Sequence, residues 1–332
     1  MTSLLAIYIH HLDPIIVSIP GTPLAVRWYG LAYVAGFVLG YMVLLQLSKR
    51  DLYCVAPQKL GDFITAVCLF GVLMGGRLGE FFFYWLPAHG LAGLWEDPLW
   101  VLRVWEGGMA SHGGIAGVLL VAIIYAYRQR LRIPAVCDGL AIVATIGLFF
   151  GRVANFINGE LYGRICSPEN PLAMKFPQEL FELPADTQLQ ALNAVEHAAD
   201  GPVRVADAAG RIHLSYEQLM ETVRTSEPAR EALGQYLNPR YPSQLFEALG
   251  EGLLIFAVLI TLRLVWKKAP AGIFSALFCF LYAIARIVSE CFKEPDAPTW
   301  GNITRGQYLS FGIVALGLVF LITALCGRKK AA

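Results

Sequence analysis

Polar and charged residues interrupt several long apolar stretches of this chain, and their types suit chemistry on an anion. They are Arg77, Glu80, His112, Arg152, Asn155, Glu247, Glu251, Arg286 and Glu290. A charged side chain at the centre of a bilayer costs roughly 2.5–3.5 kcal/mol on insertion scales, so such residues are rare there and usually mark a functional site. We therefore expect these side chains to share one task.

The depth of these residues can be counted from the Lys and Arg residues that flank each apolar stretch. At about 1.5 Å per helical residue, five of these residues and one tyrosine lie about 24–30 Å from the basic end of their own stretch. The six are Tyr29, Arg77, His112, Arg152, Glu247 and Arg286. Side chains from six different stretches are thus expected near the opposite surface of the bilayer.

Two interpretations of the arginines stay open at this point. Arg77 with Glu80, and Arg286 with Glu290, have i,i+3 and i,i+4 spacing, so each pair could simply satisfy its own charges. The alternative is a shared cavity for an anion. Because a guanidinium matches the geometry of a phosphate, the expected ligand is then an anionic phospholipid headgroup. His112 would either pack within the bundle or accept a proton beside that phosphate.

The elements that must position these residues are long apolar helices. Hydrophobic residues make up 56% of the 332 residues and charged residues only 15%, which argues against a water-soluble enzyme. Seven stretches are long enough to cross a bilayer, which takes about 20 residues. They are Trp28–Leu47, Asp62–Leu86, Met109–Tyr127, Ala135–Ile157, Leu245–Trp266, Ala271–Phe292 and Gln307–Leu325.

Lys and Arg concentrate in alternate short loops, which predicts an outer N-terminus and an inner, cytoplasmic C-terminus. The predicted fold is an all-α membrane protein with seven transmembrane helices and a small outer head between helices 4 and 5. The predicted parts are an amphipathic segment 1–27, helices 1–4 in 28–157, the head 158–244, and helices 5–7 with the tail in 245–332. Within the head we expect helices near Gln188–Ala199 and from about Tyr216, the second starting with a capping box at Ser215.

Small and acidic residues add two structural expectations. Gly71, Gly75 and Gly79 recur every four residues, as do Gly113 and Gly117, and this spacing favours close helix packing. Asp62 and Asp138 are each expected to begin a helix on the inner side, where a carboxylate stabilises the helix N-terminus.

Several classes of protein and site are not expected. A net charge of +1 offers no general attraction for nucleic acid. The seven cysteines are scattered and contain no C-x-x-C pair, so neither a disulfide framework nor a zinc site is predicted. With a single intramembrane histidine we expect no metal, and no cofactor is implied.

Six ordered motifs resemble those of the bacterial prolipoprotein diacylglyceryl transferases. The most specific is the run from Gly151 to Glu160, GRVANFINGE. The others are Arg27-Trp28-Tyr29-Gly30, Gly75-Gly76-Arg77, Glu106-Gly107-Gly108-Met109 with Ser111-His112-Gly113-Gly114, Pro242-Ser243-Gln244-Leu245 with Glu247, and Arg286 with Glu290, Pro295 and Asp296. One departure is visible, because Tyr241 and Phe246 replace the usual His and Tyr of the fifth motif.

The resemblance implies a multi-pass protein of the bacterial inner membrane with a periplasmic head. It implies transfer of the diacylglyceryl group of phosphatidylglycerol to the lipobox cysteine of a prolipoprotein signal peptide, with a thioether as one product and glycerol phosphate as the other. The partners would be that lipid, that peptide and the surrounding membrane lipids.

The resemblance also suggests roles for individual residues. Arg152 would hold the lipid phosphate, with Asn155 and Glu160 close by. His112 and Arg286 correspond to residues with essential roles. From the chemistry, we expect Arg286 to stabilise the leaving group, and either His112 to take the thiol proton or the arginines to stabilise the thiolate directly. The remaining substrate-binding candidates are Arg77, Tyr29, Tyr282 and Glu247.

Three rival functions were weighed against this one. An organic-anion transporter would also bury arginines, but transporters usually show internal repeats and a midplane site, and no repeat is visible. A serine protease built on Ser111 and His112 is disfavoured because adjacent helical residues point about 100° apart. A lipid-binding scaffold without chemistry is disfavoured only by the family motifs.

Overall fold

The computed structural model of this chain describes residues 7–18, 25–97, 99–103, 108–199, 201, 203–206, 212–214, 216–295 and 304–329. The chain forms two compact units. The first unit comprises Met1–Val34, Leu148–Leu253 and Ala283–Phe311, and the second comprises Ala35–Gly147, Leu254–Tyr282 and Gly312–Ala332. Glu106, Gly107, Asp296 and the predicted cap Ser215 lie outside the described residues.

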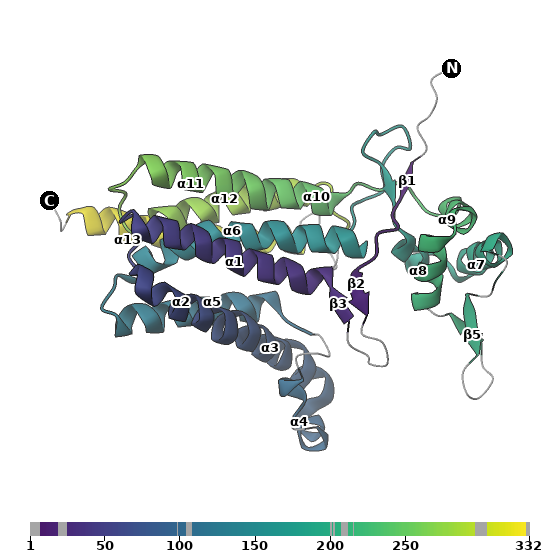
Figure 1. The fold of residues 1–332 in the computed structure, drawn as a ribbon, viewed down its shortest axis with the longest axis horizontal. Coiled ribbons are helices and arrows are strands. Elements are labelled where there is room, and N and C mark those ends of the chain that lie inside the picture. Colours follow the sequence, from purple (N-terminus) through teal and green to yellow (C-terminus); the bar gives the residue numbers. More distant parts are fainter. Residues whose placement is uncertain are drawn as a thin grey trace. The chain divides into compact units, whose positions relative to one another are not determined.

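Helices form most of the described structure (Figure 1). The α-helices are α1 (Trp28–Lys49), α2 (Pro57–Ala66), α3 (Gly75–Glu80), α4 (Leu86–Glu96), α5 (Ser111–Arg128), α6 (Ile133–Asn158), α7 (Ala185–Ala199), α8 (Tyr216–Thr225), α9 (Glu227–Gly234), α10 (Ser243–Glu247), α11 (Ile255–Val265), α12 (Ile273–Ser289) and α13 (Arg305–Lys329). Wider π-helical stretches join some of them, namely η1 (Val67–Met74), η2 (Phe81–Trp85) and η6 (Ala248–Leu254). Short 3₁₀ turns are η3 (Trp100–Leu102) and η5 (Pro177–Glu182).

Six helices of the described chain are long and apolar enough to cross a membrane. They are Trp28–Lys49, Pro57–Gly90, Ser111–Arg128, Ile133–Asn158, Ser243–Val265 and Gly306–Gly327. A shorter apolar helix, Ile273–Ser289, occupies the position of the sixth predicted span. The prediction of a helical, multi-pass membrane protein is confirmed by these elements.

The structure also contains short strands that hydropathy did not predict. They are β1 (Tyr8–Ile9), β2 (Ile15–Ser18), β3 (Ala25–Arg27), β4 (Met174–Lys175), β5 (Arg204–Ala206) and β6 (Ile212–Leu214). They form three two-stranded sheets, in which β1 pairs parallel with β4, β2 antiparallel with β3, and β5 antiparallel with β6. Strands of two to four residues are too short to show an alternating apolar pattern.

Close glycine packing joins α3 and η1 to α5 inside the second unit. A Cβ placed on Gly75 would lie 2.7 Å from the carbonyl oxygen of Gly113 and 3.0 Å from Cα of Gly117. On Gly71 it would lie 3.0 Å from Cα of Val118. These backbones therefore touch, as the four-residue glycine spacing predicted.

The segment between α6 and α10, in the first unit, carries its own small core. Helix α7 packs on α9, which also contacts α8 and β1. Their fully buried side chains include Leu180, Val195, Leu219 and Leu233. Helix α9 begins at Ser226, whose hydroxyl accepts a hydrogen bond from the backbone N–H of Ala229. The two helices predicted for this segment are thus present, the second one divided into α8 and α9.

Asp138 has a different role from the one predicted. It lies more than one turn inside α6 rather than at its start, and Asp62 lies equally far inside α2. The Asp138 carboxylate accepts hydrogen bonds from the backbone N–H groups of Gly272 and Ser275, at 2.7 and 2.8 Å. The Ser275 hydroxyl donates a third, at 2.9 Å. Asp138 therefore stabilises the N-terminus of α12, because carboxylates are favourable at any helix N-terminus that they can reach.

Candidate functional site

Two arginines from separate helices of the first unit share the same pair of carboxylates. Arg152 of α6 places Nε 3.1 Å from Oε2 of Glu247 and Nη2 3.5 Å from Oε2 of Glu251. Arg286 of α12 donates from Nη1 to Oε1 of Glu247 at 2.6 Å, and lies 3.4 Å from Glu251. One turn apart on α10 and η6, the two glutamates face the same side and can bridge both arginines.

A third carboxylate and a hydroxyl complete this cluster. Oε1 of Glu290 forms an ion pair at 2.6 Å with Nη2 of Arg286, which lies four residues earlier in the chain. Ser289 donates to Glu251 at 2.8 Å. A Cβ on Gly306 would collide with the Glu290 carboxylate, so the glycine allows the first turn of α13 to approach the cluster. We call Arg152, Arg286, Glu247, Glu251 and Glu290 the arginine–glutamate cluster.

The arginine–glutamate cluster is almost completely removed from solvent. The side chains of Glu247 and Glu251 are 0% exposed, whereas those of Arg152 and Arg286 are 17% and 12% exposed. The buried Lys293 acts on Glu247 with its positive charge. Burial of charges is unfavourable unless they are paired. The carboxylates therefore fix the two guanidinium groups in place, and the arginines form the more accessible edge of the cluster.

A second group of side chains lies beside Arg152 in the same unit. Asn155, one turn along α6, donates from Nδ2 to Oε1 of Glu160 at 2.8 Å and also to the Tyr29 hydroxyl. Tyr29 stacks on Tyr33, with ring centroids 6.2 Å apart. Arg152 lies close enough to Tyr29 for an electrostatic interaction. The structure thus brings together six residues predicted for the site, namely Tyr29, Arg152, Asn155, Glu160, Glu247 and Arg286.

The turn that carries Glu160 is held by side chains that the site prediction had not named. Gln244 donates to the Glu160 carbonyl at 2.7 Å, and Gln178 donates to the Asn158 carbonyl at 2.8 Å. Gly159 has φ of +72°, a conformation that a Cβ would strain, and an added Cβ would lie 3.0 Å from Nδ1 of His10. Gln244 was visible as part of a motif, whereas nothing in the sequence pointed to Gln178 or His10.

His10 of the first unit packs under this turn as a buried neutral ring. Its ring stacks on that of Phe176 and forms a T-shaped contact with that of Phe156, with centroid distances of 5.6 and 5.4 Å. Burial lowers the pKa of His10 to about 4, the Phe156 carbonyl opposing that effect and the charges of His11 and Arg224 adding to it.

Arg77, in the second unit, is bound by backbone carbonyls. Its side chain is buried and donates hydrogen bonds to the carbonyls of Trp100, Val101, Arg103 and Gly108, at 2.7 to 3.1 Å. The guanidinium also lies 3.9 Å from the centroid of the Trp100 ring. These contacts fix the segment between α4 and α5 to α3, a role that the spacing of Arg77 and Glu80 did not reveal.

His112 and Tyr282 also belong to the second unit. His112 is the second residue of α5, and its side chain is exposed. Tyr282 stacks on Phe278 of α12, with centroids 5.7 Å apart, and lies one turn before Arg286 in the sequence of that helix. Their roles stay predictions.

The two residues that depart from the family pattern pack with one another in the first unit. The ring of Tyr241 meets that of Phe292 at 5.3 Å, and Phe246 meets Phe292 at 5.5 Å. The third pair, Tyr241 and Phe246, is 6.2 Å apart. An aromatic cluster therefore stands at the position where the family pattern has a histidine.

Metal chemistry has no visible set of ligands in the part of the chain that the structure describes. There, no group of three or more His, Cys, Asp or Glu residues is arranged to hold a metal ion. The cysteines resolved in this part are all free thiols.

Comparison with known proteins identifies the family of this chain. The sequence profile of the family described as prolipoprotein diacylglyceryl transferase matches residues 14–323. Among curated relatives, a phosphatidylglycerol–prolipoprotein diacylglyceryl transferase of Bdellovibrio bacteriovorus is 40% identical, over 95% of this chain and 93% of its own length. Proteins of the same name are 36% identical in Paramagnetospirillum magneticum, over 97% of each chain, and 34% identical in Azospirillum brasilense, over 99% of this chain and 100% of that one. The chain therefore belongs to the prolipoprotein diacylglyceryl transferase family.

Proposed function

We propose that this protein transfers the diacylglyceryl group of phosphatidylglycerol to the thiol of a lipobox cysteine in a prolipoprotein. Family membership supports the reaction, and the arrangement of Arg152 and Arg286 around Glu247 and Glu251 is the structural observation that carries it. Two guanidinium groups that are held by the same buried carboxylates are suited to binding a single phosphate group.

In this proposal Arg152 holds the phosphate of the lipid. Its Nε and Nη2 atoms face Glu247 and Glu251, and among the described residues no contact occupies Nη1. A guanidinium has five N–H donors, so Arg152 can keep its carboxylate partners and still donate to a phosphate oxygen. Asn155, Tyr29 and Glu160 form the polar wall next to it and would position the glycerol part of the lipid.

The chemical step forms one bond and breaks one bond. The cysteine sulfur attacks the glycerol carbon bonded to the phosphate oxygen, a C–S bond forms, and the C–O bond breaks. Its electron pair leaves on the oxygen of glycerol phosphate. Arg286 would stabilise the charge that accumulates there. His112 would accept the thiol proton, which must leave because the thiolate is the reactive form. The family resemblance alone supports the proposal that Arg77 and Tyr282 take part in substrate binding.

The proposed topology has seven transmembrane helices in the bacterial inner membrane. In this scheme α12, although short, is the sixth span, the N-terminus is periplasmic, and the C-terminus is cytoplasmic. Residues 1–27 and 158–244 would then form the periplasmic parts, connected by helices 1–4 in 28–157 and followed by helices 5–7 in 245–332. Basic residues in alternate loops support this orientation.

The reaction can be tested with the purified full-length protein, phosphatidylglycerol and a synthetic lipobox peptide. Mass spectrometry should detect a peptide whose mass has increased by one diacylglyceryl group, together with free glycerol phosphate. Phosphatidylcholine should give no product, and a peptide with serine in place of the cysteine should stay unmodified. Absence of the thioether with wild-type protein and phosphatidylglycerol would refute the proposed reaction.

A further inference from the structure

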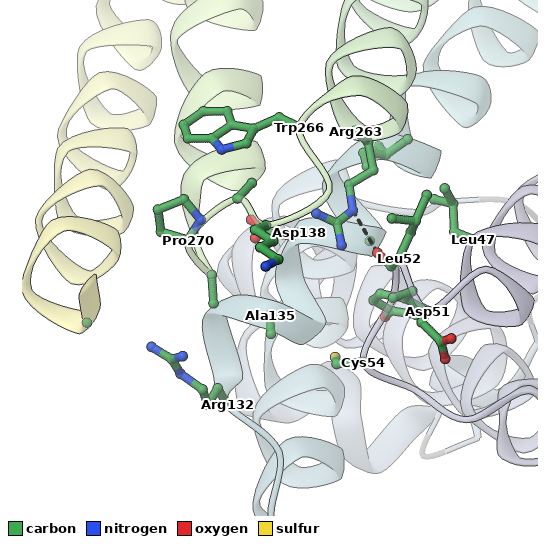
Figure 2. A pocket seen from close by; sticks show the side chains of 17 residues that line it. Leu47, Asp51, Leu52, Cys54, Arg132, Ala135, Asp138, Arg263, Trp266 and Pro270 are labelled. Carbon is green, nitrogen blue, oxygen red and sulfur yellow. Dashed lines mark hydrogen bonds between the residues drawn. The ribbon is translucent and has the colours of Figure 1, made fainter. Parts of the chain in front are cut away.

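The second unit contains a cavity of about 460 Å³ that the proposed reaction does not use. It lies where the α1–α2 loop, the start of α6, the α11–α12 turn and the C-terminal end of α13 meet (Figure 2). All of its lining residues belong to the second unit. Its volume lies within the range of roughly 300–1,000 Å³ that is typical of small-molecule sites.

Three cationic side chains from three segments line this cavity: Arg132, Arg263 and Lys268. Arg263 is fixed in place, because its Nε donates to the Leu52 carbonyl at 2.7 Å (Figure 2). Its guanidinium also lies 5.3 Å from the Phe274 ring centroid. A Cβ on Gly327 would lie 2.6 Å from Nη2 of Arg132, so that guanidinium rests against the end of α13. Within the described residues, neither Arg132 nor Lys268 forms an ion pair.

The two carboxylates at the cavity do not cancel these three cations. The Asp138 carboxylate is already bonded by two N–H groups and a hydroxyl at the start of α12. Asp51 is exposed in the loop after α1, in a positive-φ conformation. Three cations against two carboxylates leave one excess positive charge, and the hydrogen bonds at the start of α12 already satisfy Asp138, so the cavity suits a singly charged anion.

The remaining walls are apolar, which distinguishes this cavity from a site for a soluble ion. Leu47, Leu52, Ile142, Trp266 and Pro270 line it alongside the cations. Cations next to apolar walls at the ends of membrane helices match an amphiphile with a charged head and a hydrocarbon body. Basic pockets between transmembrane helices on the cytoplasmic side are typical binding sites for anionic lipid headgroups.

The surroundings of the cavity point to the same ligand. The loops that supply its lining also carry Arg50, Arg130 and Lys267, all exposed. This basic rim lies on the side that the distribution of Lys and Arg assigns to the cytoplasm. Anionic lipids of that leaflet are attracted to such a surface.

We propose that this cavity binds the phosphate group of an anionic phospholipid from the leaflet on the basic side, as a second lipid site separate from the transfer reaction. Arg263 would form the fixed part of the site, and Arg132 and Lys268 would close on the phosphate from the rim. The acyl chains would leave the cavity along the apolar walls. This inference does not depend on the chemistry proposed for Arg152 and Arg286.

The test is native mass spectrometry of the full-length protein purified in detergent with added dilauroyl phosphatidylglycerol. The double variant Arg132→Gln/Lys268→Gln should retain one lipid fewer than wild type and bind that lipid about thirty-fold more weakly, the equivalent of about 2 kcal/mol at 1.4 kcal/mol per tenfold. The single variant Arg132→Lys, in which Lys268 is unchanged, should bind the lipid much more strongly than the double variant, since it keeps the positive charge.

The matched control is Lys49→Gln/Arg128→Gln. It removes one Lys and one Arg, both exposed, from the same basic side but outside the cavity lining. This variant should retain as many lipids as wild type. Both double variants should keep the elution volume and thermal midpoint of wild type, and the rate of lipid transfer at saturating phosphatidylglycerol.

Three outcomes would overturn the proposal. In the first, the cavity variant retains the same number of lipids as wild type. In the second, the control variant loses as much binding as the cavity variant, which would show diffuse attraction. In the third, millimolar inorganic phosphate or 0.5 M NaCl displaces the extra lipid, which would indicate a free-phosphate site or screened surface binding. Retention of the lipid under both conditions supports a lipid headgroup held in the cavity.

Discussion

Glu247 is the residue on which both site arginines converge, and its removal should affect both of them. We predict that Glu247→Gln lowers the transfer rate at least about ten-fold and destabilises the protein by about 3–5 kcal/mol, because both guanidiniums lose their closer shared carboxylate and keep only the longer contacts to Glu251. Activity assays and thermal unfolding in detergent measure the two effects.

Glu290→Gln provides the comparison for this prediction, because Glu290 contacts Arg286 but has no contact with Arg152 among the described residues. It should cost less in both assays. Equal losses from the two variants would contradict a shared role for Glu247.

The Tyr29 hydroxyl orients Asn155, and a substitution that removes only this hydroxyl tests the contact. Tyr29→Phe removes the hydroxyl that accepts from Asn155, which should raise the KM for phosphatidylglycerol several-fold and cost about 1 kcal/mol in stability. Tyr33→Phe is the control, because Tyr33 stacks on Tyr29 but makes no side-chain hydrogen bond in the described part of the chain. If both variants have the same KM as wild type, the hydroxyl of Tyr29 does not position the lipid.

At the scale of single residues, the sequence indicates which side chains matter better than it indicates their partners. The i,i+4 spacing of Arg286 and Glu290 offered an ion pair as one of two interpretations, and the structure contains that pair. The four carbonyls around Arg77 could not be predicted, because they come from the 3₁₀ turn η3 and from irregular backbone, whose direction no periodic pattern specifies. The contacts of Ser289 and Gln178 were missed because they depend on tertiary packing.

Among the elements, the contact between α3 and α5 depends on glycines that tolerate no side chain. Gly113→Ala should destabilise the protein by about 1–3 kcal/mol, because the new Cβ would overlap the Gly75 carbonyl and Cα of Gly79. Gly114→Ala should change stability by less than about 0.5 kcal/mol, because its nearest neighbour would be 3.9 Å away. Thermal unfolding of the two variants checks this. A Gly113 variant as stable as the Gly114 variant would show that the helices separate without cost.

The N-terminal strand β1 brings a pH-sensitive residue under the turn of Glu160. Because the pKa of His10 is lowered to about 4 in the fold, the unfolded chain binds a proton before the folded chain does as the pH falls. His10 should therefore impose no cost above about pH 6.5 and progressively lower the stability between pH 6.5 and pH 4. The total loss is about 3 kcal/mol.

The thermal midpoint of wild type, His10→Phe and His11→Gln, followed from pH 7 to pH 4, tests this expectation. The dependence on pH should become smaller in His10→Phe and should persist in His11→Gln. A His10→Phe variant with the same pH profile as wild type would assign the transition to another group.

The elements were predictable to the extent that one strong signal determined them. Long apolar runs located the membrane helices, and the predicted stretch 109–127 differs from α5, Ser111–Arg128, by only one or two residues at each end. The strands were not predicted, because hydrogen bonds between distant segments such as β1 and β4 define them. Asp138 was assigned to its own helix because sequence distance hides that α12 begins beside it.

At the scale of the whole molecule, the distribution of basic residues and the proposed number of spans determine which side each loop faces. An odd number of spans would place the termini on opposite sides, and the basic loops would then assign the C-terminus to the inside. The proposed second lipid site would then face the cytoplasm, and the segment between α6 and α10 would face the periplasm. The orientation therefore decides which leaflet supplies lipid to each site.

Cysteine accessibility in intact cells tests this orientation directly. In a full-length background whose seven cysteines are replaced by alanine, Glu169→Cys adds one thiol at an exposed position of the segment between α6 and α10. Asp51→Cys adds one in the exposed loop after α1. A membrane-impermeant maleimide should label the protein at position 169 in spheroplasts and label position 51 only after lysis, because the bilayer separates the two positions. The reverse pattern would invert the orientation, and labelling of both positions before lysis would mean that they share a side, which is incompatible with the proposed topology.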